Sequence, residues 1–211
     1  MDIRLTVIPV GPLQMNSIFL SADGPNGPEA ILIDPGADPE RLLRVIEDSG
    51  CKLTSLLATH GHFDHIEGAV EIQKVHDLPL RCHVEDKPVI EFMQQAQAGY
   101  GLPVTPFPNY VTDLENGGSI DFAGMKISIT HVPGHSPGQV MFRIPGYAIV
   151  GDCLFAGSVG RTDLPGGDFP TLEKSIREHI YTLDDETIVV SGHGPDTTVG
   201  RERTSNPFVQ G

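Results

Sequence analysis

Short runs of alternating hydrophobic and polar residues, separated by glycine and proline, dominate the chain. Alternation with a period of two is typical of a strand with one buried face, and a short apolar run is typical of a strand buried on both faces. We therefore predict strands at residues 3–10, 16–21, 30–33, 53–58, 80–83, 120–122, 126–130, 139–144, 147–150 and 187–190. Two pairs of these strands, split by Ala123-Gly124 and by Pro145-Gly146, are predicted hairpins.

Helical periodicity occurs between the predicted strands. Asp38 and Pro39 supply an N-cap and a first helical residue for one helix, and Gly50 ends it. We predict further helices at residues 69–75, at residues 85–98 and around Leu172, Ile176 and Ile180. No linker or low-complexity segment divides the chain. We therefore predict a single domain over residues 1–211, with strands in two groups and helices outside them.

Composition and charge narrow the classes of function. The chain has 211 residues, of which 39% are hydrophobic, and a formal net charge of −14. A negative chain repels nucleic-acid phosphates and anionic lipids, so we expect no nucleic acid and no membrane as a partner. No apolar run reaches the roughly 18 residues of a membrane span, the N-terminus lacks a signal-peptide pattern, and the three cysteines are far apart. We expect a cytoplasmic protein with reduced thiols, and the sequence leaves the oligomeric state open.

Several predicted strands end in residues that can bind a metal. The strands that end near residues 58, 130, 150 and 190 are followed by His60, His135, Asp152 and His193 respectively. Loops at strand ends are the places where a rigid scaffold positions chemistry. We therefore expect these residues to belong to a functional site.

The strongest motif is the segment from His60 to His65, which reads His-x-His-x-Asp-His. Imidazole and carboxylate groups are ligands of zinc, iron and manganese. Four such groups cannot share one face of a helix, but on a turn after a strand they can surround more than one ion. They are too few for two closed sites, so we expect His135, Asp152 and His193 to complete them. The alternative interpretation is a solvated histidine-rich loop.

The order of these residues resembles that of the metallo-β-lactamase superfamily over nearly the whole chain. That resemblance implies an α/β fold, a four-layer αββα sandwich with a metal site at one edge. It also implies two ions and their ligands: His60, His62 and His135 for the first, Asp64, His65 and His193 for the second, and Asp152 between them. Residues 33–36 resemble a further signature of the family, which implies that Asp34 fixes the orientation of a ligand ring.

Residues 154–168 resemble one branch of this superfamily, the short bacterial glyoxalase II proteins or hydroxyacylglutathione hydrolases. Persulfide dioxygenases share the Gly-Arg-Thr-Asp element at residues 160–163, so it is the Leu-Pro-Gly-Gly-Asp that follows, at residues 164–168, that favours the hydrolase. Larger glyoxalase II enzymes use a C-terminal helical domain to bind glutathione. This chain stops soon after His193, so we expect it to hold glutathione more weakly.

The resemblance implies a dinuclear metal-dependent hydrolase of a glutathione thioester such as S-D-lactoylglutathione. Two divalent ions, zinc first and iron or manganese as alternatives, can share a water and lower its pKa, so that a bridging hydroxide attacks the carbonyl carbon. Asp64 and Asp152 are the predicted catalytic ligands. Arg161 and Arg203 are the predicted contacts for the carboxylates of glutathione, whereas Tyr100 is interpreted as loop packing.

Two alternatives to this hydrolase stay open. The first is a mononuclear iron glutathione-persulfide dioxygenase, an oxidoreductase on the same fold. The second is a binding or regulatory module that keeps the fold without catalysis. The seven intact ligand positions argue against the second alternative.

Overall fold

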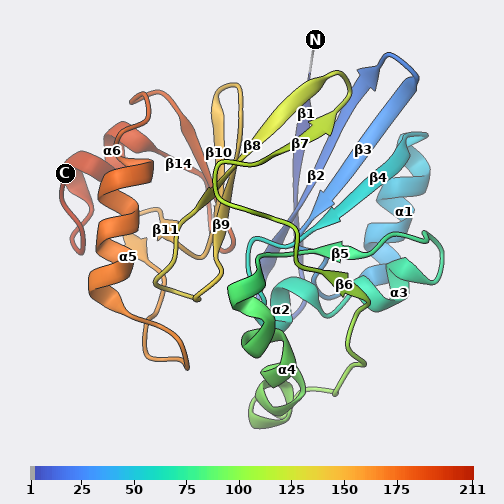
Figure 1. The fold of residues 1–211 in the computed structure, drawn as a ribbon, viewed down its shortest axis with the longest axis horizontal. Coiled ribbons are helices and arrows are strands. Elements are labelled where there is room, and N and C mark those ends of the chain that lie inside the picture. Colours follow the sequence, from blue (N-terminus) through green and yellow to red (C-terminus); the bar gives the residue numbers. More distant parts are fainter. Residues whose placement is uncertain (1–2) are drawn as a thin grey trace.

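Two six-stranded sheets pack face to face in the computed structural model, which describes residues 3–211 (Figure 1). The first sheet consists, in spatial order, of β1 (Arg4–Val10), β2 (Met15–Gly24), β3 (Gly27–Ile33), β4 (Lys52–Leu57), β5 (Leu80–Arg81) and β6 (Tyr110–Val111). Neighbours from β1 to β3 run antiparallel, and neighbours from β3 to β6 run parallel. Parallel neighbours need crossover segments, and these segments carry most of the helices on this side of the molecule.

The second sheet is mostly antiparallel. Its strands, in spatial order, are β14 (Thr197–Thr198), β13 (Ile188–Ser191), β10 (Tyr147–Gly151), β9 (Val140–Ile144), β8 (Met125–His131) and β7 (Ser119–Phe122). The two predicted hairpins are present as β7–β8 and β9–β10, and β10 pairs in parallel with β13. A separate short hairpin joins β11 (Leu154–Phe155) to β12 (Ser158–Val159).

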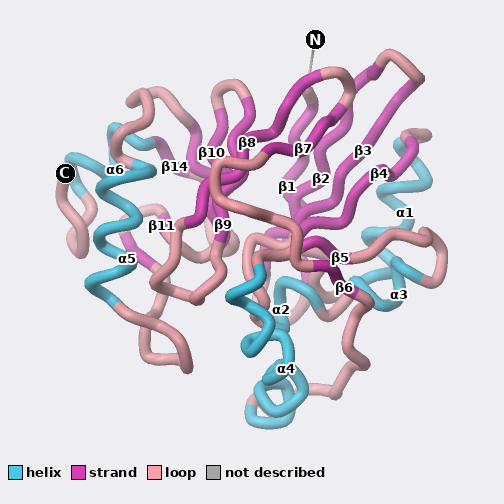
Figure 2. Tube along the Cα trace, in the orientation of Figure 1, coloured by secondary structure: helices cyan, strands magenta, loops and turns pink. Residues whose placement is uncertain are grey.

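Helices cover the outer face of each sheet, as Figure 2 shows. On the first sheet and in the loops at its edge the helical elements are α1 (Pro39–Ser49), α2 (Phe63–Ile66), α3 (Ala69–Gln73), the 3-10 turn η1 (Val84–Asp86) and α4 (Lys87–Gly99). On the second sheet they are α5 (Phe169–Ser175), its π-helical continuation η2 (Ile176–Ile180) and α6 (Val199–Ser205). α1 and α3 lie on the right of Figure 1, and α5 and α6 on the left.

Three buried apolar clusters hold these layers together. Along β3, Ala30 and Leu32 belong to the cluster under α1, α3 and α4, whereas Ile31 and Ile33 belong to the cluster between the sheets. The apolar run at residues 30–33 is therefore a strand that is buried on both faces, with alternate side chains in the two clusters. A third cluster packs α5, η2 and α6 against the second sheet. The prediction of a four-layer αββα sandwich is confirmed, and a single domain over residues 1–211 stays a prediction.

Two helix starts differ from expectation. The helix predicted over residues 85–98 becomes α-helical at Lys87, because Pro88 lacks an N–H and therefore fits the first turn of a helix better than its interior. Asp38 does precede α1, but it has a left-handed backbone with a φ of 57° and its side chain does not cap the helix. Its carboxylate instead accepts a hydrogen bond of 2.9 Å from the N–H of Gly11.

The loops that follow β3, β4, β8, β10 and β13 gather at one edge of the two sheets, around the short helix α2. Elements as short as α2, β11, β12 and β14 escaped prediction, since they hold too few residues for a periodic pattern. No helix within residues 3–211 combines the length and the apolar character that a membrane crossing requires.

Candidate metal centre

Seven potential metal ligands from four segments of the chain meet at the edge of the two sheets where these loops gather. The structure brings together every side chain that the sequence predicted as a ligand: His60, His62, Asp64, His65, His135, Asp152 and His193. Their ligand atoms form three overlapping groups, and within each group all atoms lie within 4.8 Å of one another. Distances of this order allow one cation to contact all members of a group.

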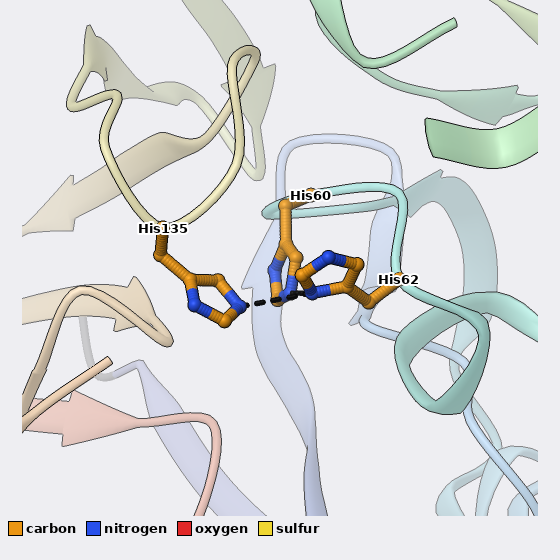
Figure 3. Close-up of side chains that lie close together, drawn as sticks. All are labelled: His60, His62 and His135. Carbon is orange, nitrogen blue, oxygen red and sulfur yellow. Dashed lines mark hydrogen bonds between the residues drawn. The ribbon is translucent and has the colours of Figure 1, made fainter. Parts of the chain in front are cut away.

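The first group consists of three histidine rings that point toward one another (Figure 3). The Nδ1 atom of His62 lies 3.0 Å from Nε2 of His60 and 2.9 Å from Nε2 of His135. His60 and His135 are buried, and His62 is partly exposed. Three ring nitrogens so arranged present their lone pairs to a common point, which suits a tetrahedral metal with one open position.

The second group consists of Asp64, His65 and His193, and it lies beside the first. The Nε2 atom of His193 lies 3.3 Å from Oδ2 of Asp64, and Nε2 of His65 lies 3.4 Å from Oδ1 of Asp152. The other oxygen of Asp152, Oδ2, lies 3.6 Å from His193 and 3.7 Å from His135. The Asp152 carboxylate therefore lies between the two groups and can contact an ion in each.

The local fold around the histidine motif differs in one respect from expectation. His60 and His62 lie on the loop after β4, but Asp64 and His65 lie on α2 rather than on a continuing turn. Consecutive side chains on a helix are about 100° apart around its axis, so Asp64 and His65 point in different directions from the first turn of α2. The loop and the helix together spread the four ligands around two centres.

Hydrogen bonds from outside the site fix the orientation of the rings. The Nδ1 atom of His65 donates to the carboxylate of Asp34 at 2.9 Å. The hydroxyl of Thr59 donates to the same carboxylate at 2.8 Å, so its oxygen is left to accept from Nδ1 of His60 at 3.0 Å. The predicted role of Asp34 agrees with this geometry, because its carboxylate orients one ring directly and a second through Thr59.

Two further rings are oriented by backbone carbonyls. The Nδ1 atom of His135 donates to the carbonyl of Arg161 at 2.7 Å, and Nδ1 of His193 donates to the carbonyl of Leu13 at 3.1 Å. With the Nδ1 proton engaged in this way, the Nε2 lone pair of each neutral ring faces the site. This arrangement is typical of histidines that ligate metals.

Two buried polar atoms of the site are unpaired. Among the described residues, Nε2 of His65 and Oδ1 of Asp152 are inaccessible to solvent and make no hydrogen bond, although the two atoms lie 3.4 Å apart. Native proteins rarely leave such atoms unsatisfied, because each costs about 1–3 kcal/mol. A cation bound by both atoms would remove that cost, so the residues present fit a metal site.

The pKa values of these groups also suit a divalent cation. Burial and the neighbouring imidazoles lower the pKa of His62 to about 3 and that of His60 well below its usual value, so both rings are neutral. Burial also opposes a charge on His65, but the carboxylates around it, led by Asp152, raise its pKa. Burial would raise the pKa of Asp152, yet the contact with His65 holds it below its usual range. The neutral rings of His60 and His62 and the ionised carboxylate of Asp152 are therefore in the states that bind metals, whereas His65 releases a proton when an ion binds.

One residue that the sequence did not indicate connects the two ligand loops. The buried carboxylate of Asp86, at the end of η1, accepts hydrogen bonds of 2.7 Å from the N–H groups of Gly61 and Gly138, and it accepts a third from the hydroxyl of Ser136. Gly61 lies between two histidines of the first group, and Ser136 follows His135. Asp86 therefore holds the two loops of the first group at a fixed separation.

A cavity of about 930 Å³ opens above the ligand groups. Five of the candidate ligands line it, together with side chains from α4 and from the segment that contains β11 and β12. This volume lies at the upper end of the range of about 300–1,000 Å³ for small-molecule sites. The site can therefore admit a substrate much larger than a water molecule.

The structure separates the two predicted substrate contacts. Arg161 lines the cavity, where its guanidinium donates to both carboxylate oxygens of Asp163 at 2.7 and 2.8 Å and to the hydroxyl of Tyr100 at 3.2 Å. Arg203 lies outside the lining: it bonds the carbonyl of Tyr181 and the carboxylate of Asp185. The structure therefore does not bring Arg203 to the cavity, and its contact with a substrate stays a prediction that this geometry does not favour. Tyr100, expected to pack within a loop, is half exposed and lines the cavity.

Comparison with known proteins gives full-length similarity. A family model described as the metallo-beta-lactamase superfamily matches residues 10–193. Hydroxyacylglutathione hydrolase GloC of Haemophilus influenzae is 36% identical over 210 residues, or 98% of each chain. The crystal structure of the BLEG-1 B3 metallo-beta-lactamase matches with a TM-score of 0.88 at 34% identity, over 99% of this chain and 100% of that one. TTHA1623, solved in a di-iron-bound form, matches with a TM-score of 0.85 at 39% identity, over 97% and 100%.

Proposed function

Because the chain belongs to the metallo-beta-lactamase superfamily, in a short branch similar to glyoxalase II, we propose that it is a metal-dependent hydrolase of thioesters and that glutathione thioesters are its substrates. The similarity to GloC over 98% of both chains supports the substrate class. The observation that carries the reaction class is the convergence of two ligand groups on a shared carboxylate, that of Asp152, at the floor of a large cavity.

We propose that two divalent ions occupy the site. The proposed ligands are His60, His62 and His135 for the first ion, Asp64, His65 and His193 for the second, and Asp152 for both. When bound, such ions polarise a substrate carbonyl and lower the pKa of a nearby water, which is the chemistry that thioester hydrolysis needs. The donor set accepts zinc, iron or manganese, and iron is a practical candidate because TTHA1623 was solved with two iron ions.

The chain's own residues keep the site ready for this reaction. Protons stay on the Nδ1 atoms of His60, His65, His135 and His193, where outer acceptors hold them, so these rings cannot rotate into the cavity. The carboxylates of Asp64 and Asp152 remain ionised and orient the reactants beside the scissile bond. Hydrolysis joins the oxygen of water to the acyl carbon, breaks the carbon–sulfur bond and leaves a proton on the thiolate.

The persulfide dioxygenase alternative predicts a single iron on the first ligand group. The second group argues for the hydrolase, because Asp64, His65 and His193 offer a further set of ligand atoms within 4.8 Å of one another. These three residues would have no partner ion in a mononuclear enzyme. Metal content therefore separates the two functions.

The test measures metal content and activity on the same protein. We expect about two ions per chain, hydrolysis of S-D-lactoylglutathione, and no oxygen uptake with glutathione persulfide. His62→Ala is expected to abolish hydrolysis, whereas His179→Ala, on η2, is expected to leave it unchanged. One iron per chain with oxygen uptake and no thioester cleavage would overturn the proposal. Hydrolysis of benzylpenicillin is measured in the same assay, because BLEG-1 is described as a B3 metallo-beta-lactamase.

A further inference from the structure

Three large apolar side chains are exposed around one opening. Leu13, Phe92 and Tyr100 are 41%, 42% and 51% exposed, and all three line the cavity above the candidate metal centre. Scattered exposed apolar residues are ordinary on protein surfaces, but a contiguous group at a cavity marks a binding surface. Part of the cavity wall is therefore suited to bind an apolar group of a ligand.

Helix α4 supplies one wall of the cavity with apolar side chains that the core uses only in part. Ile90 and Met93 face the core cluster beneath the helix. Val89, Phe92 and Ala96, spaced at i, i+3 and i+7, form a second stripe that lines the cavity, and of these Ala96 also packs against the core cluster. A surface helix normally carries polar residues outside its core face, so the exposed ring of Phe92 is unexplained by packing in the core.

The opposite wall is also apolar. Phe155 and Val159 come from β11 and β12, and Leu164 and Pro165 come from the segment that follows. The ring of Phe155 lies against that of His193, with centroids 6.3 Å apart, so this wall reaches the ligand groups themselves. Apolar side chains of this wall therefore reach the candidate metal centre, with Ser158 and Arg161 as the polar residues among them.

Charge contributes little to recognition in this cavity. Of the described residues that line it, Arg161 is the one charged side chain outside the ligand set. Its guanidinium is already engaged by Asp163 at 2.7 and 2.8 Å and by Tyr100 at 3.2 Å. An anionic group of a substrate would compete with a bidentate partner that is already in place. Apolar contact is thus the main source of binding that the walls offer.

We propose that the substrate carries a bulky apolar group, the size of a phenyl ring or larger, which packs between Phe92 on α4 and Phe155 on the opposite wall. This inference rests on the proposed thioester hydrolysis only for the identity of the bond that is cleaved. The apolar group belongs to either the acyl side or the thiol side of that bond, and the arms of the experiment distinguish the two.

The first measurement is binding, and it does not depend on catalysis. S-Benzylglutathione and S-methylglutathione are thioethers that cannot be hydrolysed, and they differ by a phenyl ring. By calorimetry on the metal-loaded protein we expect the benzyl compound to bind about tenfold more tightly. In Phe92→Ala that ratio is expected to fall to about twofold or less. Phe208→Ala is the matched control, because Phe208 is 55% exposed and lies outside the cavity lining.

Hydrolysis then assigns the side of the bond. S-Mandeloylglutathione carries a phenyl ring where S-D-lactoylglutathione carries a methyl group on the acyl side. The acetyl thioesters of benzyl mercaptan and ethanethiol make the same exchange on the thiol side. A preference in either pair that Phe92→Ala abolishes identifies that side. Equal binding of the two thioethers, no binding of either, or a ratio unchanged by Phe92→Ala overturns the inference. A benzyl preference without any thioester cleavage instead overturns the proposed activity and leaves the apolar subsite in place.

Discussion

Replacing Asp86 with asparagine tests whether a residue outside the ligand set controls the metal centre. The carboxylate accepts from Gly61 through Oδ2 and from Ser136 and Gly138 through Oδ1. In Asp86→Asn one oxygen becomes an NH₂ group, which faces either the N–H of Gly61 or that of Gly138. Two donors then oppose each other in a buried place, and the loops that carry His60, His62 and His135 are released from one another.

The magnitude follows from that single lost acceptor. A buried donor without a partner costs about 1–3 kcal/mol. Burial raises the pKa of Asp86, so removing its charge offsets part of this cost, and we expect a net loss of about 2 kcal/mol. For a chain of this length that loss lowers the Tm of the metal-free protein by about 4–8 °C. If the carboxylate also positions the ligand loops, zinc affinity falls by about 10–100-fold.

The control is a second buried acid with the same number of hydrogen bonds. The carboxylate of Glu202 accepts from Gly157, Thr197 and Asn206 at 2.9, 2.6 and 2.9 Å, and none of these is a candidate ligand. We expect Glu202→Gln to lower the Tm by a similar amount but to leave zinc affinity unchanged. Affinity is measured by competition with a chromophoric chelator, and Tm by calorimetry. A zinc affinity that Asp86→Asn leaves within twofold, or that both variants weaken equally, would refute the positioning role.

Two further predictions concern the bound ions and the arginines. Removal of the ions with a chelator is expected to lower the Tm by about 5–16 °C. The reason is that ligands present at 100–1,000 times their Kd stabilise a protein by about 2.7–4.1 kcal/mol. A Tm unaffected by the chelator would contradict a metal site of this affinity. Arg161→Ala is expected to raise the KM for S-D-lactoylglutathione by only about threefold, because its guanidinium is already engaged by Asp163. Arg203→Ala, which loses its bonds to Tyr181 and Asp185, is expected to leave KM unchanged and lower the Tm by about 2–4 °C. Equal KM values for the two variants would show that position in the cavity does not decide substrate contact.

The parts of this molecule that the sequence predicted are those in which neighbouring residues share a pattern. Alternation and short apolar runs predicted the strands, and an apolar run such as residues 30–33 is explained because Ile31 and Leu32 face two different apolar clusters. The segment from His60 to His65 predicted a metal centre because several ligand types stand within one turn of chain. The short α2 escaped prediction because four residues cannot show a helical period, although α2 determines where Asp64 and His65 point.

Long-range partners carry no such pattern. Asp86 is 25 residues from Gly61 and 52 from Gly138, so nothing near it in the sequence marks it as the link between two ligand loops. Arg161 and Arg203 are equally basic, and only the fold separates a cavity residue from one that bonds Tyr181. In the sequence, Phe92 resembles an ordinary core residue of an amphipathic helix. Its place at the cavity is recognised only when the structure shows that Ile90 and Met93 already form the core face of α4.

The orientation of the histidine rings shows the limit of sequence interpretation most clearly. Of the four outer acceptors, the side chains of Asp34 and Thr59 are visible in the sequence, but the carbonyls of Leu13 and Arg161 belong to the backbone. A backbone carbonyl is present at every position, so the residue type does not indicate which carbonyl accepts a hydrogen bond from a ligand ring. It follows that a side-chain substitution at Leu13 cannot remove the acceptor of His193, whereas one at Asp34 removes the acceptor of a ring outright. The half of the site held by carbonyls therefore depends on the path of the chain, and the half held by Asp34 and Thr59 depends on two residues.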